Sequence, residues 1–157
     1  MEDIGKDDLC ALLDKLLLSS LELIEQDVRL SQETNRLIAD GKLDLAHTRF
    51  TKGPNAVSVV QLPTEDYNPF RALSTVAVSP DNQGVPQLTL ERHAVQASEE
   101  RIDPASWFGI LRPPTLNSAR DKFARSLDAI VERANVRATL GSYLNVFAIL
   151  NKRKSVQ

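Results

Sequence analysis

His47 and His93 are the side chains best suited to acid–base or metal chemistry in this 157-residue chain, and Cys10 is its single thiol. Neither histidine has a Cys, His or carboxylate partner at the spacing of a metal-ligand motif. Cys10 falls in an apolar helical pattern and is expected to be a small buried hydrophobe in a reducing compartment. The six glycines are scattered singly, without a phosphate loop or a Gly-x-Ser-x-Gly elbow. The sequence therefore predicts no catalytic residue, no metal site, no cofactor and no enzyme activity.

The segment 103–114 differs most from the rest of the chain. Four large apolar side chains fall within five residues between proline brackets: Trp107, Phe108, Ile110 and Leu111. Burying each of them contributes roughly 1.5 to 3 kcal/mol, so they are expected to dock on something. One interpretation is a local core that joins the chain's own helices, which is the more common role of aromatic residues. The other is an anchor for a partner protein, for which Trp and a neighbouring Arg are favoured.

Length and charge narrow the function classes. A chain of 157 residues with 42% hydrophobic content suits one domain with a modest core. A net charge of -2 disfavours nucleic-acid binding, which normally needs a basic excess. Met1 to Asp3 is acidic where a signal peptide needs positive charge, and no run of about 18 apolar residues could span a bilayer. Any membrane association is expected to be peripheral.

The first third of the chain predicts a long helix from about Asp7 to Phe50, on the order of 65 Å long. Gly53-Pro54 provides a stop signal. Leucine recurs every seven residues, and these leucines are predicted to face a partner helix: Leu9, Leu16, Leu23, Leu30 and Leu37. The companion heptad positions Ser20, Asp27 and Thr34 are polar, so this seam does not specify a strong parallel homodimer.

All eight prolines fall between Pro54 and Pro114. Short alternating runs on both sides of the Pro80–Gly84 turn signal allow a small hairpin. A mostly irregular linker fits these residues equally well. The sequence thus divides into an N-terminal helix (1–53), a linker (54–102), a docking segment (103–114) and a C-terminal helix with a basic tail (115–157), with both helices in one domain.

The C-terminal third regains a helical pattern, and four of its apolar residues are predicted to pair with the first helix: Phe123, Leu127, Ile130 and Leu144. Residues 1–52 carry eleven acidic and seven basic side chains, and residues 115–157 carry three and eight. Opposite net charges favour pairing, and antiparallel pairing is the simpler connection, although the linker is long enough for a parallel one. The predicted fold class is all-α: an antiparallel two-helix hairpin or coiled coil with an irregular insert that has room for a short β-hairpin.

Lys152-Arg153-Lys154 ends the last helix. These charges are expected to be solvated and to complement the helix dipole. Contact with an anionic membrane is the weaker interpretation, because three charges fall short of the four to eight that typically indicate it.

Two segments carry a family resemblance. Residues 45–58 (Leu45-Ala46-His47-Thr48-Arg49-Phe50-Thr51-Lys52-Gly53-Pro54-Asn55-Ala56-Val57-Ser58) resemble a Leu-Ala-x-x-Arg-aromatic-x-x-Gly-x-x-x-Val motif. Residues 103–116 resemble an Asp-Pro-x-x-Trp-Phe-Gly-Ile-Leu-x-Pro-x-x-Leu motif. With flanking coiled-coil helices, both are similar to the small coiled-coil assembly factor of the vacuolar proton-pumping ATPase. The middle of the chain carries no such match, and Pro114 departs from the pattern.

The resemblance implies a non-catalytic chaperone for the membrane sector of the pump, and hence a role in acidifying vacuoles or lysosomes. It implies peripheral attachment at the cytosolic face of the endoplasmic reticulum, extending to vesicles between that compartment and the Golgi. The implied partners are a membrane-spanning assembly factor and the membrane-sector subunits. Combining motif and burial, we predict these partner-binding residues: Trp107, Phe108, Ile110, Leu111, Arg49 and Phe50. The alternative function is a generic coiled-coil adaptor or tether in vesicle traffic.

Overall fold

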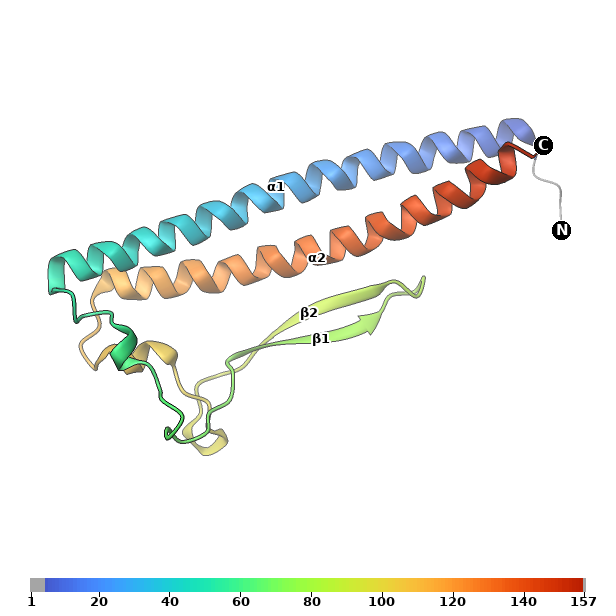
Figure 1. Cartoon of the computed structure of the whole chain (residues 1–157). Coiled ribbons are helices and arrows are strands. Elements are labelled where there is room, and N and C mark those ends of the chain that lie inside the picture. The colour runs from blue at the N-terminus through green and yellow to red at the C-terminus, as the bar shows by residue number, and fades with distance from the viewer. Residues whose placement is uncertain (1–4, 157) are drawn as a thin grey trace.

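The chain folds into two long helices joined at one end by an insert (Figure 1). The structure, a computed structural model, describes residues 5–156, so the acidic stretch Met1 to Asp3 lies outside the described residues. Helix α1 spans Lys6–Lys52 (47 residues) and α2 spans Pro114–Lys154 (41 residues). The insert contains, in chain order, η1 (Val59–Gln61), β1 (Ser74–Pro80), β2 (Pro86–Arg92), η2 (Ala97–Glu99) and η3 (Pro104–Phe108), where η marks a short 3-10 helix.

Helix α1 turns one stripe of side chains toward α2. The leucines at positions 9, 13, 30 and 37 are buried in this stripe, at the three- and four-residue spacing that keeps side chains on one helix face. Three further buried positions carry hydroxyl groups, each of which donates a hydrogen bond to the carbonyl oxygen four residues earlier: Ser20 to Leu16 (2.7 Å), Thr34 to Leu30 (2.8 Å) and Thr48 to Asp44 (2.8 Å). Because the donors are satisfied within their own helix, burying them leaves no unpaired group.

The facing stripe of α2 consists mainly of small side chains. Its buried members are Leu116, Ala119, Ser126, Ala129 and Val136. On the α1 side, Gly41 is also buried, and a Cβ atom at this position would lie 3.0 Å from the ring of Phe123. The missing side chain therefore allows the Phe123 ring to approach the α1 backbone.

Ion pairs across the seam establish the direction and register of the two helices. Asp27 accepts hydrogen bonds from Arg133 (2.8 Å) and Arg137 (2.7 Å), and Asp44 accepts one from Lys122 (2.7 Å). Because the earlier residue of α1 meets the later residues of α2, the helices run antiparallel. Hydrogen bonds from Arg137 and Arg133 lower the pKa of Asp27 to about 2.

The two strands form an antiparallel hairpin, with Ser74 opposite Arg92 and Pro80 opposite Pro86. The turn is built around Asp81, whose carboxylate accepts hydrogen bonds from the N–H groups of Gln83 and Val85, both at 2.8 Å. Such local side-chain-to-backbone bonds are the reason that Asp favours turns.

The hairpin lies along α2 and is attached to it through β2 (Figure 1). The Asn135 side chain donates to the carbonyl oxygen of Leu88 (2.8 Å) and accepts from its N–H group (2.7 Å). The Arg92 guanidinium donates to the carbonyl oxygen of Ala124 (2.9 Å) and to the Asp128 carboxylate (2.7 Å). Helix α2 thus contacts both α1 and the sheet.

The all-α class predicted from the sequence is wrong, because the fold combines two long helices with a two-stranded antiparallel sheet. The sheet forms on either side of the Pro80–Gly84 turn signal, where the sequence allowed a hairpin. Its anchor, Asn135, lies 47 residues from Leu88 along the chain. Local alternation could not reveal this contact, so the sequence left the hairpin and an irregular linker equally open.

We expect Leu30→Ala to lower the free energy of unfolding by about 2 to 5 kcal/mol, the usual range for truncating a buried leucine. Leu30 packs against Ala129 and Val136, and neither is large enough to fill the cavity. Urea unfolding followed by far-ultraviolet circular dichroism would measure the loss. Leu43→Ala is the control, since Leu43 is 67% exposed on the same helix. Equal losses in both variants would contradict this seam.

We also expect the stabilisation by Asp27 to depend on pH. Its folded pKa of about 2 lies below the ordinary value of 3.8, so the contribution is fully present above pH 3.8 and is lost as the pH falls toward 2. The difference in unfolding free energy between the wild type and Asp27→Asn should therefore shrink over this range. Glu25→Gln is the control, because Glu25 forms an exposed ion pair with Arg29 on its own helix. A difference that is independent of pH would contradict this role for Asp27.

Candidate functional site

The segment that carries the Trp-Phe-Gly-Ile-Leu motif is attached to α2 by Asp103. Its carboxylate accepts from the N–H group of Ala105 (3.0 Å), at the start of η3, and forms ion pairs with Arg112 and Arg120. Burial raises the pKa of Asp103, but the bonds from Arg112 and Ala105 and the charges of Arg112 and Arg120 outweigh it, so the pKa lies below its usual value. Asp103 thus holds both ends of the motif in place.

Trp107 faces into the insert. Its ring makes edge contacts with Phe70 (5.1 Å between centroids) and Tyr67 (6.4 Å). Its indole nitrogen is buried and has no hydrogen-bond partner among the described residues. Such aromatic pairs contribute about 0.5 to 1.5 kcal/mol beyond the area they bury. Trp107 therefore closes the aromatic cluster that holds the insert together.

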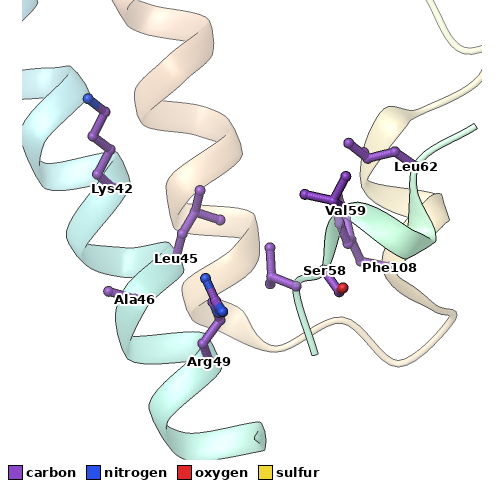
Figure 2. Close-up of a pocket in the computed structure, with 9 residues that line it drawn as sticks. Lys42, Leu45, Ala46, Arg49, Ser58, Val59, Leu62 and Phe108 are labelled. Atoms are coloured by element: carbon purple, nitrogen blue, oxygen red, sulfur yellow. The ribbon is translucent and has the colours of Figure 1, made fainter. Parts of the chain in front are cut away.

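Phe108 faces the opposite way, toward the helices, and lines a groove beside the end of α1 (Figure 2). The groove encloses about 350 Å³ and is mainly apolar. Figure 2 shows Val59, Leu62 and Phe108 across from the helix, with Lys42 and Arg49 on the helix side. The groove is lined by Lys42, Leu45, Ala46 and Arg49 of α1, Val57, Ser58, Val59 and Leu62 in and around η1, and Phe108 of η3.

A capping box positions the η1 wall of the groove. The Ser58 hydroxyl accepts from the N–H group of Val60, and the Gln61 side chain accepts from the N–H group of Ser58 (2.9 Å). These bonds fix the short helix that carries Val59 and leads to Leu62. The groove can therefore hold an apolar segment, and its two cations favour one that also carries carboxylates.

Ile110, Leu111 and Phe50 lie outside the groove, with 98%, 96% and 88% of their surface exposed. Lys52, in the last turn of α1, lines a shallow hollow together with Ile110 and Leu111. We call Phe50, Lys52, Ile110 and Leu111 the tip. The structure thus divides the six predicted partner-binding residues: Arg49 and Phe108 meet in the groove, Trp107 packs inward, and Phe50, Ile110 and Leu111 project from the end of the helix pair.

The residues predicted to pair the helices also differ in how deeply they are buried. Leu9, Leu30 and Leu37 are buried, while Leu16, Leu23 and Phe123 are half-buried. Leu127, Ile130 and Leu144 are exposed, outside the seam in which Ala129 and Val136 are buried. The prediction rested on the large apolar residues of α2, whereas the buried stripe consists mainly of small residues, and half-buried charged residues such as Arg133 border it.

His93, one of the side chains considered for acid–base or metal chemistry, contacts the sheet. His93 Nε2 lies 2.8 Å from the Thr75 hydroxyl, beside the sheet. Within residues 5–156, no three His, Cys, Asp or Glu side chains form a group that could hold a metal ion. Over the same residues, no helix has both the length and the apolar composition needed to cross a bilayer.

Lys42, Val59 and Leu62 line the groove, but the sequence did not predict them as site residues. Val57 and Ser58, at the end of the first motif, also line the groove. The motif stops there and does not include the rest of the wall that faces α1. The run Val57 to Leu62, in which four of the six side chains are apolar, was a usable signal for that wall.

We expect Trp107→Ala to loosen the insert while leaving the helices intact, because the Phe70 and Tyr67 contacts are lost. Trypsin should then cleave faster after Arg71 and Arg101, with no change in helical circular dichroism. Trp107→Phe is the control and should resist trypsin nearly as well as the wild type, since the indole nitrogen makes no hydrogen bond to the described residues. A Trp107→Ala chain as resistant as the wild type would show that this cluster does not hold the insert.

Comparison with known proteins places these motifs in context. No family model matches the chain. The human vacuolar ATPase assembly protein VMA22 is 26% identical over 151 residues, an alignment that covers 83% of this chain and 84% of that protein. The similarity extends well beyond the two motifs and confirms the predicted resemblance. Over most of its length, this chain is similar to a vacuolar ATPase assembly protein.

Proposed function

We propose that this chain is a non-catalytic assembly factor for the membrane sector of the vacuolar proton-pumping ATPase. It acts at the cytosolic face of the endoplasmic reticulum through a membrane-spanning partner. The observation that carries this proposal is the similarity to VMA22 over 83% of the chain. The two long helices and the groove are features of a binding protein, which suits such a role.

The groove is the surface we assign to the membrane-spanning partner. Its apolar lining, with Leu45 on the helix side and Phe108 across from it, can bury aliphatic side chains, each of which contributes roughly 1.5 to 3 kcal/mol when fully buried. Lys42 and Arg49 line the groove on its helix side, and none of the described residues that line it is acidic. The occupant is therefore an apolar segment of the partner that carries Asp or Glu.

The groove lies at one end of the long helix pair, and this position determines how a bound partner would be held. At 1.5 Å per residue, the 47 residues of α1 extend over about 70 Å. The insert is held to α2 at Leu88, Arg92 and Asp103 and thus forms one unit with the helices. In this mechanism, a partner bound in the groove is held at one end of a stiff arm, and incomplete pump subunits are kept from wrong contacts along it.

We expect the chain, tagged at its N-terminus and isolated from endoplasmic-reticulum membranes in mild detergent, to co-purify with a membrane-spanning protein and with subunits of the pump's membrane sector. Arg49→Glu should lower their recovery by about tenfold, because it places a carboxylate against the acidic segment. Arg36→Glu is the control, an identical charge reversal on α1 that lies thirteen residues before Arg49, outside the groove. Mass spectrometry would quantify each protein.

Two results would contradict parts of this proposal. Recovery of coat or tethering proteins without pump subunits would overturn the assembly role and favour the coiled-coil adaptor. Equal recovery with Arg49→Glu and Arg36→Glu would overturn the assignment of the groove and leave the assembly role standing.

A further inference from the structure

The two-stranded sheet has one edge that faces away from the helices. Strand β2 packs on α2 and pairs with β1 on its other side (Figure 1). Two bonds flank the ladder: the N–H group of His93 donates to the carbonyl oxygen of Leu73 (2.8 Å), and that of Asp81 donates to Val85 (2.9 Å). Because bonded residues alternate along an antiparallel strand, the odd-numbered residues of β1 bond to β2. The even-numbered residues therefore point their backbone groups outward: Ser74, Val76 and Val78.

This outer edge of β1 is open. Arg101 donates to the carbonyl oxygen of Ala72 (2.7 Å) just before the strand, but among the described residues no hydrogen bond reaches the outward groups of β1. Val76 and Val78 are 51% and 67% exposed. Proteins usually protect such edges with charged side chains, bulges or a covering segment. Ser74–Pro80 contains no charged residue, and its ladder with β2 has no bulge, so the edge can accept a further strand.

The residue order of β1 is nearly the same in both directions from Ala77. Val76 and Val78 flank it, and Thr75 and Ser79 come next. Two copies paired antiparallel about a two-fold axis at Ala77 bring Val76 opposite Val78 of the second copy. The same axis brings Thr75 opposite Ser79. Pairs of β-branched residues and Thr–Ser pairs are favourable across antiparallel strands, so β1 is complementary to itself, as a two-fold interface requires.

This register also aligns the backbone groups. The outward N–H and C=O groups of Val76 meet those of Val78 in the second copy, and the two residues exchange both bonds. Ser74 donates to the carbonyl oxygen of Pro80 in the second copy. Pro80 has no N–H group to donate in return, but it is the last residue of the strand. The pairing therefore satisfies every outward N–H group of β1.

No like charges meet in this arrangement. The charged residues of β2 are Glu91 and Arg92, which lie opposite Thr75 and Ser74 of β1. Their rows across the joined sheet end at uncharged residues of the second copy: Gln87 and Pro86. Along the chain, the charged residues nearest to β1 have opposite signs, with Arg71 before the strand and Asp81 after it. Antiparallel pairing places these opposite charges at the same end of the interface.

The other edge of the sheet limits growth to two copies. Asn135 of α2 bonds to both backbone groups of Leu88 (2.8 and 2.7 Å), so the outer edge of β2 is already occupied there. Since strands lie about 4.8 Å apart, the β2 strands of two copies would be roughly 14 Å apart. Each α2 lies on its own β2, so this separation exceeds the roughly 8–10 Å at which helices pack. The two helix pairs therefore fit beside one another.

We propose that the free edge of β1 binds the β1 strand of a second copy of this chain. The product is a four-stranded antiparallel sheet with a two-fold axis at Ala77. Strands of this length bury a small area, so the dimer is weak and depends on concentration. This inference goes beyond the proposed function and does not rest on it.

Sedimentation velocity of the purified full-length chain over a concentration series tests the proposal. We expect the mean mass to rise from that of one chain toward that of two. Val78→Pro should weaken dimerisation by about tenfold or more, because each copy loses an outward N–H donor. It leaves the bonds to β2 intact, since proline is tolerated where the N–H group of an edge strand faces solvent. Val78→Thr, the matched control, keeps the donor and the branched side chain and should dimerise as the wild type does.

Disulfide trapping tests the register. Ala77→Cys is made in a Cys10→Ser background, which removes the only native thiol. At the two-fold axis the two Cα atoms form a non-hydrogen-bonded pair about 4.5 Å apart, within the reach of a disulfide. Mild oxidation should therefore give a covalent dimer. Ser79→Cys, the matched control in the same background, should stay monomeric alone and form a covalent dimer only when mixed with Thr75→Cys.

Three outcomes would overturn the inference: a chain that stays monomeric at every concentration, equal dimerisation by the Val78→Pro and Val78→Thr variants, or equal trapping of Ser79→Cys alone and Ala77→Cys. The first would indicate that another protein's extended segment occupies the edge. All three are independent of the co-purification experiment. A chain that recovers pump subunits but stays monomeric keeps its proposed function and loses the sheet dimer.

Discussion

The seam between the two helices is the constraint on which the rest of this structure depends. It is narrow and only partly apolar: leucines on α1 meet small side chains on α2, and the buried hydroxyls of Ser20, Thr34 and Thr48 bond to their own helix. Leucine packing alone leaves the register of such a seam poorly defined. Asp27, held between Arg133 and Arg137, defines it, because a shift of α2 would leave a carboxylate at the seam without its cations.

The antiparallel register brings the end of α1 and the start of α2 together, and this proximity creates both the groove and the tip. The insert has to leave from and return to the same end of the helix pair (Figure 1). Asp103 then ties the returning chain to α2, while Asn135 and Arg92 tie down the hairpin farther along the helix. The groove forms where the departing and returning segments cross beside α1, and the tip forms where the returning segment turns into α2.

Trp107 and Ile110 show how far residue type predicts role within one motif. Both belong to an apolar cluster that the sequence identified as unusual, and two roles were considered for it, core and partner anchor. The structure assigns these roles to different residues three positions apart: Trp107 packs on Phe70 and Tyr67, and Ile110 is exposed. Composition could not separate them, because the turn at Gly109 decides the direction in which each side chain points.

The sequence by itself determined the elements with strong local periodicity and punctuation. The leucine repeat predicted a helix from about Asp7 to Phe50, and α1 spans Lys6–Lys52, ending at the expected Gly53. Only the tertiary structure decided the hairpin, the face of α2 that is buried, and the groove. These depend on distant residues that the fold brings together, such as Leu88 with Asn135, and Leu45 with Phe108 across the groove. Such pairings leave no periodic pattern in the sequence. Local propensity records the preference of a segment for a helix, whereas the partner of each helix face is decided by packing and charge pairing in three dimensions.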